Sequence, residues 1–248
     1  MNRPASRSLD EQAIDFATEI TRTVAGVIDG VTPFEATILE GSGRRQFVVR
    51  QSPETGICLP LSSGSEVTLT ARFKGELDRT GLHIRIETSA IKVYFGPAAG
   101  QPLFRYEYDA AHTSAMPRAH LQVGDQSDFA ALASLGGDGS RTSRRRNDRI
   151  DGGLVPRSDH LHFPVGGDRF RPALEDVLKM LVEQLGVDAL PDWRATVKAA
   201  RHRWRTTQVK SAVRDHPAAA AEALQALGYD VVAPESGHPN PSARLTEI

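Results

Sequence analysis

The sequence predicts a single α+β domain, in which an antiparallel sheet is packed by an N-terminal helix and a C-terminal helical segment. Three patterns predict this fold class: apolar residues recur at helical period before residue 30, at period two between residues 31 and 133, and at helical period again after residue 172. The chain has 248 residues, of which 40% are hydrophobic and 25% charged, a composition typical of a globular protein with a substantial core.

The N-terminal segment 1–30 is predicted to be an amphipathic helix. Ser8 and Glu11 have the three-residue spacing of a capping box, which satisfies backbone N–H groups at the start of a helix. Apolar residues then recur at helical spacing until Gly30. These residues are Ile14, Ala17, Ile20, Val24 and Ile28.

The segment 31–133 is predicted to form the antiparallel sheet. Its clearest strand alternates polar and apolar residues from Glu66 to Phe73. Further candidate strands lie at 34–38, 46–49, 82–86, 91–95, 103–108 and 119–123. The connections between them are too short for crossover helices, so we expect antiparallel strands with one face exposed to solvent.

Three further segments complete the predicted chain. Residues 134–159 are rich in glycine and arginine and almost without apolar residues, which favours a flexible loop. Residues 160–233 are predicted to form a final strand and the C-terminal helices of the same domain. The helices are expected at 174–185, 191–215 and 217–228, followed by one more strand at 229–232. The Pro-, Ser- and Gly-rich segment 234–248 is predicted to be a disordered tail.

Composition excludes several classes of protein. The single cysteine, Cys58, excludes an intramolecular disulfide and is expected to be a structural thiol. Because residues 1–7 are polar and no run of 18 apolar residues follows, we expect neither a signal peptide nor a membrane span, and a cytoplasmic location. The net charge is −1, so any affinity for nucleic acid must come from local basic patches.

Histidines near the predicted end of the sheet are the candidate catalytic residues. In the run from His160 to Pro172, alternation along a strand sends His160 and His162 to one face, and His112 and His120 lie in the same half of the predicted sheet. One imidazole then takes a proton and another donates one, while Arg105 stabilises the developing negative charge. The alternative is that these histidines are polar strand positions or hydrogen-bonded structural groups. Their spacing matches no known metal signature, and we predict neither a metal nor a cofactor.

Two basic segments are candidate nucleic-acid-binding sites. The helix predicted from Pro191 carries both tryptophans on one narrow stripe, and cations flank that stripe: Arg194, Lys198, Arg201 and Arg205. The predicted loop carries a second group of cations: Arg144, Arg145 and Arg146. Rows of cations bind phosphates with a salt-dependent affinity. The alternative is a solvated helix and loop whose arginines pair with acidic residues elsewhere in the chain.

Some blocks of the sequence resemble known families. The blocks Arg-Tyr-Glu-Tyr at 105–108, Ala-His-Leu-Gln-Val at 119–123 and the segment 161–185 resemble an uncharacterised family of actinobacterial proteins, over nearly the whole chain. That family has no assigned activity, so the resemblance implies a related fold. The Arg-Tyr dipeptide followed by spaced histidines also resembles small toxin-like proteins of bacterial toxin–antitoxin modules, which implies an action on RNA. Those proteins are shorter and carry a denser histidine cluster.

The function predicted from the sequence is therefore that of a cytoplasmic module of a toxin–antitoxin or defence type. It is expected to contact nucleic acid through the basic helix at 191–215 and the arginine-rich loop, and RNA cleavage would use the candidate histidines with Arg105. Its expected partners are RNA or a protein such as an antitoxin, and no membrane. Two other classes stay open: a non-catalytic protein-interaction module, in which the basic helix or loop docks a protein, and a metal-dependent hydrolase.

Overall fold

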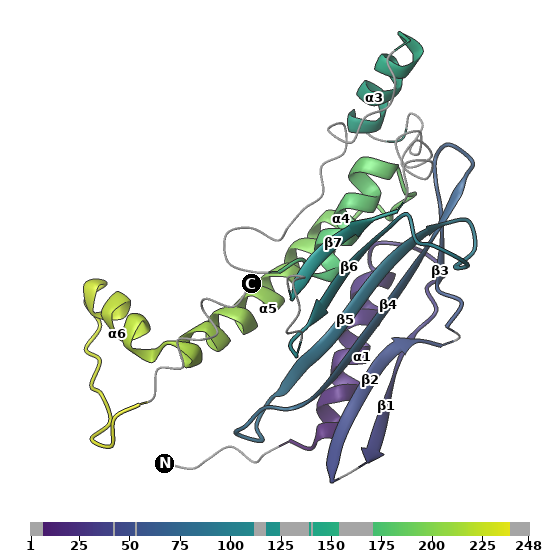
Figure 1. Cartoon of the computed structure of the whole chain (residues 1–248). Helices are drawn as coiled ribbons and strands as arrows, with labels where there is room; N and C mark the ends of the chain where they lie inside the picture. Colours follow the sequence, from purple (N-terminus) through teal and green to yellow (C-terminus); the bar gives the residue numbers. More distant parts are fainter. Residues whose placement is uncertain are drawn as a thin grey trace. The chain divides into compact units, whose positions relative to one another are not determined.

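The computed structural model describes residues 7–41, 43–52, 54–111, 118–124, 139, 141–153 and 171–238. The elements follow one another along the chain as shown in Figure 1. In order they are α1 (Leu9–Ala25), β1 (Phe34–Gly41), β2 (Arg44–Gln51), β3 (Ile57–Pro60), β4 (Glu66–Leu77), β5 (Ile84–Phe95), β6 (Phe104–Asp109), β7 (Ala119–Val123), α3 (Arg141–Asp151), α4 (Leu174–Leu185), α5 (Trp193–Asp215) and α6 (Pro217–Ala226).

The chain divides into two compact units, Met1–Lys198 and Ala199–Ile248. The first unit holds α1, the sheet, α3, α4 and the first residues of α5, and the second holds the rest of α5 and α6. The boundary falls within the region 160–233, which the sequence assigns to the same domain as the sheet.

The sheet is antiparallel and has the strand order β1-β2-β4-β5-β6-β7, with β3 pairing with the other end of β4. This confirms the predicted α+β class, with a sheet packed by an N-terminal helix and C-terminal helices. The strands predicted at 82–86 and 91–95 are one strand, β5, because the small residues between them continue the pairing with β4. The four-residue strand β3 was too short to give a pattern in the sequence.

A bulge bends the pairing of β4 with β5 after Lys74. Gly75 lies at this point, where Phe47 of β2 is its neighbour across the sheet. A Cβ atom at Gly75 would overlap the carbonyl oxygen of Arg85 and lie 2.9 Å from the Phe47 ring. The bulge therefore requires glycine.

The helix α1 packs on one face of the sheet (Figure 1). The predicted capping box is present: the N–H of Glu11 donates to Ser8 Oγ at 3.2 Å, and the N–H of Ser8 donates to Glu11 Oε2 at 2.9 Å. Phe16 contacts Phe47 of β2 and Phe73 of β4 edge-on, at centroid distances of 6.3 and 5.3 Å. The buried side of the helix comprises Leu9, Ala13, Ala17, Ile20, Thr23 and Val24.

The helix α4 packs on the same face and extends the core over β5 and β6. Asp176 begins it by accepting a hydrogen bond from the N–H of Ala173 at 3.1 Å, and Gly186 ends it with a φ of 71°. Its buried residues include Leu174, Val177, Leu178, Leu181 and Leu185. The helix predicted at 174–185 is thus confirmed with the same bounds.

Two local expectations differ from the structure. Residues 141–151, predicted as part of a flexible loop, form helix α3. Arginine is a good helix former, so this segment can be helical without an apolar stripe. Residues 229–232, predicted as a strand, have no regular secondary structure. The predicted strand at 160–163 lies outside the described residues.

Candidate functional site

One face of the sheet carries polar and charged side chains, and we call it the open face. Alternation along each strand sends residues such as Phe104, Tyr106 and Ile91 into the core, and their neighbours to the open face. The helices α1 and α4 lie against the opposite face, and neither of them covers the open face (Figure 1).

The strand register groups four cations on the open face. Lys92 of β5 stands opposite Arg105 of β6, and Arg72 and Lys74 occupy alternate positions on the neighbouring strand β4. The residues between them are short: Thr70 pairs with Lys92, and Arg72 with Ala90. The long cationic side chains therefore rise above a floor of small residues. We call Arg72, Lys74, Lys92 and Arg105 the cationic patch.

The carboxylate of Glu107 connects two of these cations to a histidine. Glu107 Oε2 lies 3.2 Å from Arg105 Nε and 3.5 Å from His120 Nε2, and its other oxygen lies 4.0 Å from Lys92 Nζ. Arg105 Nε also donates to Gln122 Oε1 of β7 at 2.8 Å. The side chains of Glu107 and His120 are only 26% and 20% exposed, so this contact is partly shielded from water.

The other two members of the cationic patch, Arg72 and Lys74, do not contact a carboxylate among the described residues. Arg72 is exposed and Lys74 half-buried. Their charge is therefore not offset locally. An anionic ligand would therefore be attracted more strongly to Arg72 and Lys74 than to the two cations that contact Glu107.

The structure brings two of the four predicted catalytic residues together. Arg105 and His120 lie on neighbouring strands and share Glu107 as a partner. His160 and His162 lie outside the described residues. Sequence reasoning missed Lys92, Arg72 and Lys74, because a polar position on one strand gives no sign of its neighbours until the register is known.

The predicted basic helix is α5. Arg194, Lys198, Arg201 and Arg205 follow one another along it at helical spacing, and the first two are exposed while the last two are half-buried. The unit boundary falls directly after Lys198. On the predicted stripe, Trp193, Val197 and Ala200 are buried, whereas Trp204 is half-buried.

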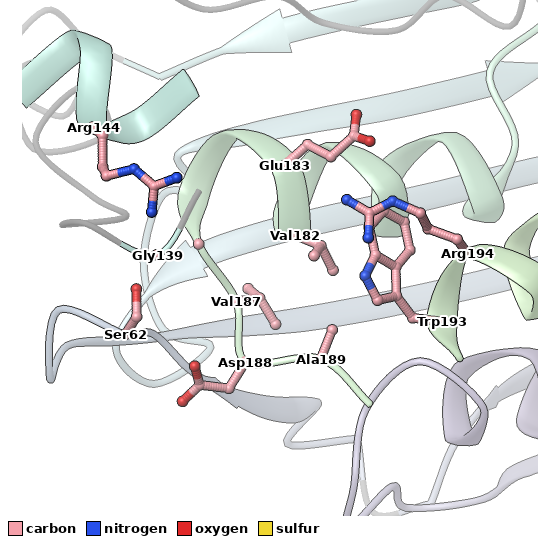
Figure 2. Close-up of a pocket in the computed structure, with 11 residues that line it drawn as sticks. Ser62, Gly139, Arg144, Val182, Glu183, Val187, Asp188, Ala189, Trp193 and Arg194 are labelled. Atoms are coloured by element: carbon pink, nitrogen blue, oxygen red, sulfur yellow. The ribbon is translucent and has the colours of Figure 1, made fainter. Parts of the chain in front are cut away.

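The arginine-rich segment contributes Arg144 and Arg145, which are exposed on α3. The side chain of Arg146 lies outside the described residues. Arg144 and Arg194 come from segments far apart in the sequence, yet both line one cavity of about 640 Å³ beside α4 (Figure 2).

Two further groups have altered acidity. Burial, with a smaller effect of the Asp176 carboxylate, raises the pKa of Tyr106 above that of an exposed tyrosine. Cys58 Sγ donates to Glu66 Oε2 at 3.1 Å, and this hydrogen bond, together with burial, raises the pKa of the thiol. A raised pKa disfavours the thiolate.

Comparisons with known proteins give no relatives. No family model matches the chain, and neither a curated protein nor a solved structure matches it. Among the described residues, no three His, Cys, Asp or Glu side chains are grouped so that they could hold a metal ion. None of the described helices combines the length and the apolar character needed to cross a membrane.

Proposed function

We propose that the chain binds single-stranded nucleic acid on the open face of its sheet. One observation carries this proposal: the cationic patch gathers four positive side chains over β4, β5 and β6, and Arg72 and Lys74 have no acidic partner among the described residues. Phosphates of a strand laid across the sheet would contact this patch. Tyr94, which lies on the same side of β5 as Lys92, offers a ring for stacking a base.

The electrostatic part of such binding depends strongly on salt. Each phosphate that a cation neutralises on a single strand contributes a slope of about −0.7 to the dependence of log affinity on log salt concentration. The chain as a whole carries a net charge of −1, so general attraction between protein and RNA is weak. Binding should therefore depend on the local patch.

The test is fluorescence anisotropy of a labelled single-stranded RNA titrated with the full chain at low and high salt. The variant Arg72→Ala/Lys74→Ala is expected to bind roughly tenfold more weakly, with a shallower salt slope. The control Arg22→Ala/Arg79→Ala removes the same charge from exposed positions on α1 and on the β4–β5 turn. Equal losses in the two variants, or no binding of the wild type at low salt, would refute the proposal and favour the protein-interaction class.

RNA cleavage at the same face is a second candidate function, favoured by the contacts of His120. His120 Nε2 lies 3.5 Å from the Glu107 carboxylate, which would stabilise the imidazole when it gains a proton. In the proposed step His120 takes the proton of a ribose 2′-hydroxyl, and the 2′-oxygen bonds to phosphorus. The bond from phosphorus to the 5′-oxygen breaks, and Arg105 stabilises the charge on the phosphoryl oxygens.

The leaving 5′-oxygen needs a proton from an acid, and the sequence predicts His160 or His162 for this role. The products would be a 2′,3′-cyclic phosphate and a 5′-hydroxyl. His120→Ala should then abolish cleavage while leaving RNA binding within about threefold, because the cationic patch stays intact. Cleavage of the corresponding single-stranded DNA, which has no 2′-hydroxyl, would contradict the mechanism.

The biological setting stays a prediction from the sequence. In a toxin–antitoxin or defence module, we expect a gene for a small acidic protein or a DNA-binding repressor beside the gene for this chain. An isolated gene would favour the competing class, a non-catalytic interaction module. Metal analysis of the purified protein tests the third class, the metal-dependent hydrolase.

A further inference from the structure

Backbone hydrogen bonds hold one wall of the cavity beside α4, the connection between α4 and α5. Leu61 pairs with Val187 in the connection between α4 and α5, and the N–H of Ser62 donates to the carbonyl oxygen of Gly186 at 3.1 Å. The N–H of Leu190, further along this connection, donates to the carbonyl oxygen of Val27 at 2.9 Å. The connection that lines the cavity is thus held on two sides.

Arg194 is held in place at one side of the cavity. Its guanidinium lies over the ring of the buried Trp193, 4.5 Å from the ring centre (Figure 2). Within the described residues it has no acidic partner. A guanidinium stacked in this way has lost little of its hydrogen-bonding capacity, because its donors point outward in its own plane. It is therefore suited to bind an oxyanion with two parallel hydrogen bonds.

The remainder of the cavity combines an apolar floor with hydrogen-bond acceptors. Val182, Val187 and Ala189 lie between Arg194 and Arg144, which enters from α3 on the other side (Figure 2). Further polar groups come from Ser62, Glu183 and Asp188. Lys179 lies 3.7 Å from the Glu183 carboxylate and offsets part of its charge.

A ligand that fits these groups carries an anionic group for Arg194, a flat apolar body for the floor, and O–H or N–H donors for the carboxylates. A nucleoside monophosphate has all three. The volume of about 640 Å³ lies within the range of about 300–1,000 Å³ that small-molecule sites occupy. Inorganic phosphate would fill only a small part of it.

We infer that this cavity binds a nucleoside monophosphate, with the phosphate on Arg194 and the base over the apolar floor. The site is independent of the proposed function, because no member of the cationic patch lines it. The nucleotide is either a free molecule or the 5′-phosphorylated end of a strand, and the experiment separates these two sources.

The experiment is isothermal titration of the full chain with adenosine monophosphate, adenosine and inorganic phosphate. We expect adenosine monophosphate to bind at least tenfold more tightly than either fragment. Arg194→Ala should weaken this binding roughly tenfold, and Arg194→Lys should recover part of it, since lysine keeps the charge without the paired donors. Arg79→Ala, an exposed arginine on the β4–β5 turn, is the matched control and should bind like the wild type.

Thermal unfolding of each variant shows whether the fold is kept. No binding at millimolar nucleotide, equal binding of adenosine, or an unaffected Arg194→Ala variant would each overturn the inference. Tighter binding of a 5′-phosphorylated trinucleotide than of the free nucleotide, lost in Arg194→Ala, would assign the site to a strand end. Weaker binding of the trinucleotide would assign it to a free nucleotide. Neither result depends on Arg72 or Lys74. The nucleotide site can therefore be refuted without refuting RNA binding on the open face, and the reverse also holds.

Discussion

Glu107 of β6 stands directly opposite His120 of β7, and their side chains meet at 3.5 Å on the open face of the sheet. The same carboxylate contacts Arg105 and Lys92. Glu107 therefore has two effects. It positions the His120 side chain, and it offsets the positive charge of Arg105 and Lys92, two of the four members of the cationic patch.

Replacing Glu107 separates these two effects. Glu107→Gln is expected to raise the affinity for single-stranded RNA several-fold at low salt and to steepen the salt slope, because two cations lose their acidic partner. Any cleavage of RNA should fall in the same variant, since His120 loses its carboxylate.

The matched control for this change is Glu40→Gln, which removes an acid from the ion pair with Arg45 at the edge strand β1. Its RNA affinity should change by less than about twofold, because the pair lies in solvent. Lower affinity in Glu107→Gln than in the wild type would contradict this account of the patch.

The bulge of β4 should be sensitive to a single methyl group. Gly75→Ala is expected to lower the free energy of unfolding by about 2 kcal/mol or more, because the new Cβ would overlap the Arg85 carbonyl and press on Phe47. Gly41→Ala, where an added Cβ meets no atom within 4 Å, should change it by less than about 0.5 kcal/mol. Urea unfolding of both variants measures the difference, and equal losses would show that the bulge tolerates a side chain.

Local signals in the sequence were sufficient for the helices that pack the sheet. The capping box of Ser8 and Glu11 acts within one turn, and Gly186 ends α4 through its own backbone conformation, so both can be predicted without the fold. In contrast, helix α3 has no apolar stripe, and composition alone suggested a loop.

The candidate site could be predicted only in part. Arg105 and Glu107 share a face by strand alternation, which is a local property. Their meeting with His120 and Lys92 depends on the register of three strands, which is set by turns and by the bulge after Lys74. The cavity beside α4 depends on contacts between distant segments and left no pattern in the sequence.

Tyr106 should make the fold sensitive to alkaline solution. Its pKa is raised in the folded state by burial, and secondarily by Asp176, whereas an unfolded tyrosine ionises near pH 10. The folded state therefore holds a proton that the unfolded state loses, and stability present below about pH 10 falls as the pH rises toward the folded pKa. Urea unfolding between about pH 8 and about pH 11 should show this loss in the wild type and less of it in Tyr106→Phe. An identical pH dependence in both proteins would contradict the assignment.

The most direct test of binding on the open face is lysine acetylation with and without RNA, read by mass spectrometry. The chain has five lysines, Lys74, Lys92, Lys179, Lys198 and Lys210, of which the first two belong to the cationic patch. A strand bound on the open face should protect Lys74 and Lys92 and leave Lys179 of α4 reactive. Protection confined to Lys198 and Lys210 of α5, or of no lysine at a saturating RNA concentration, would contradict the account.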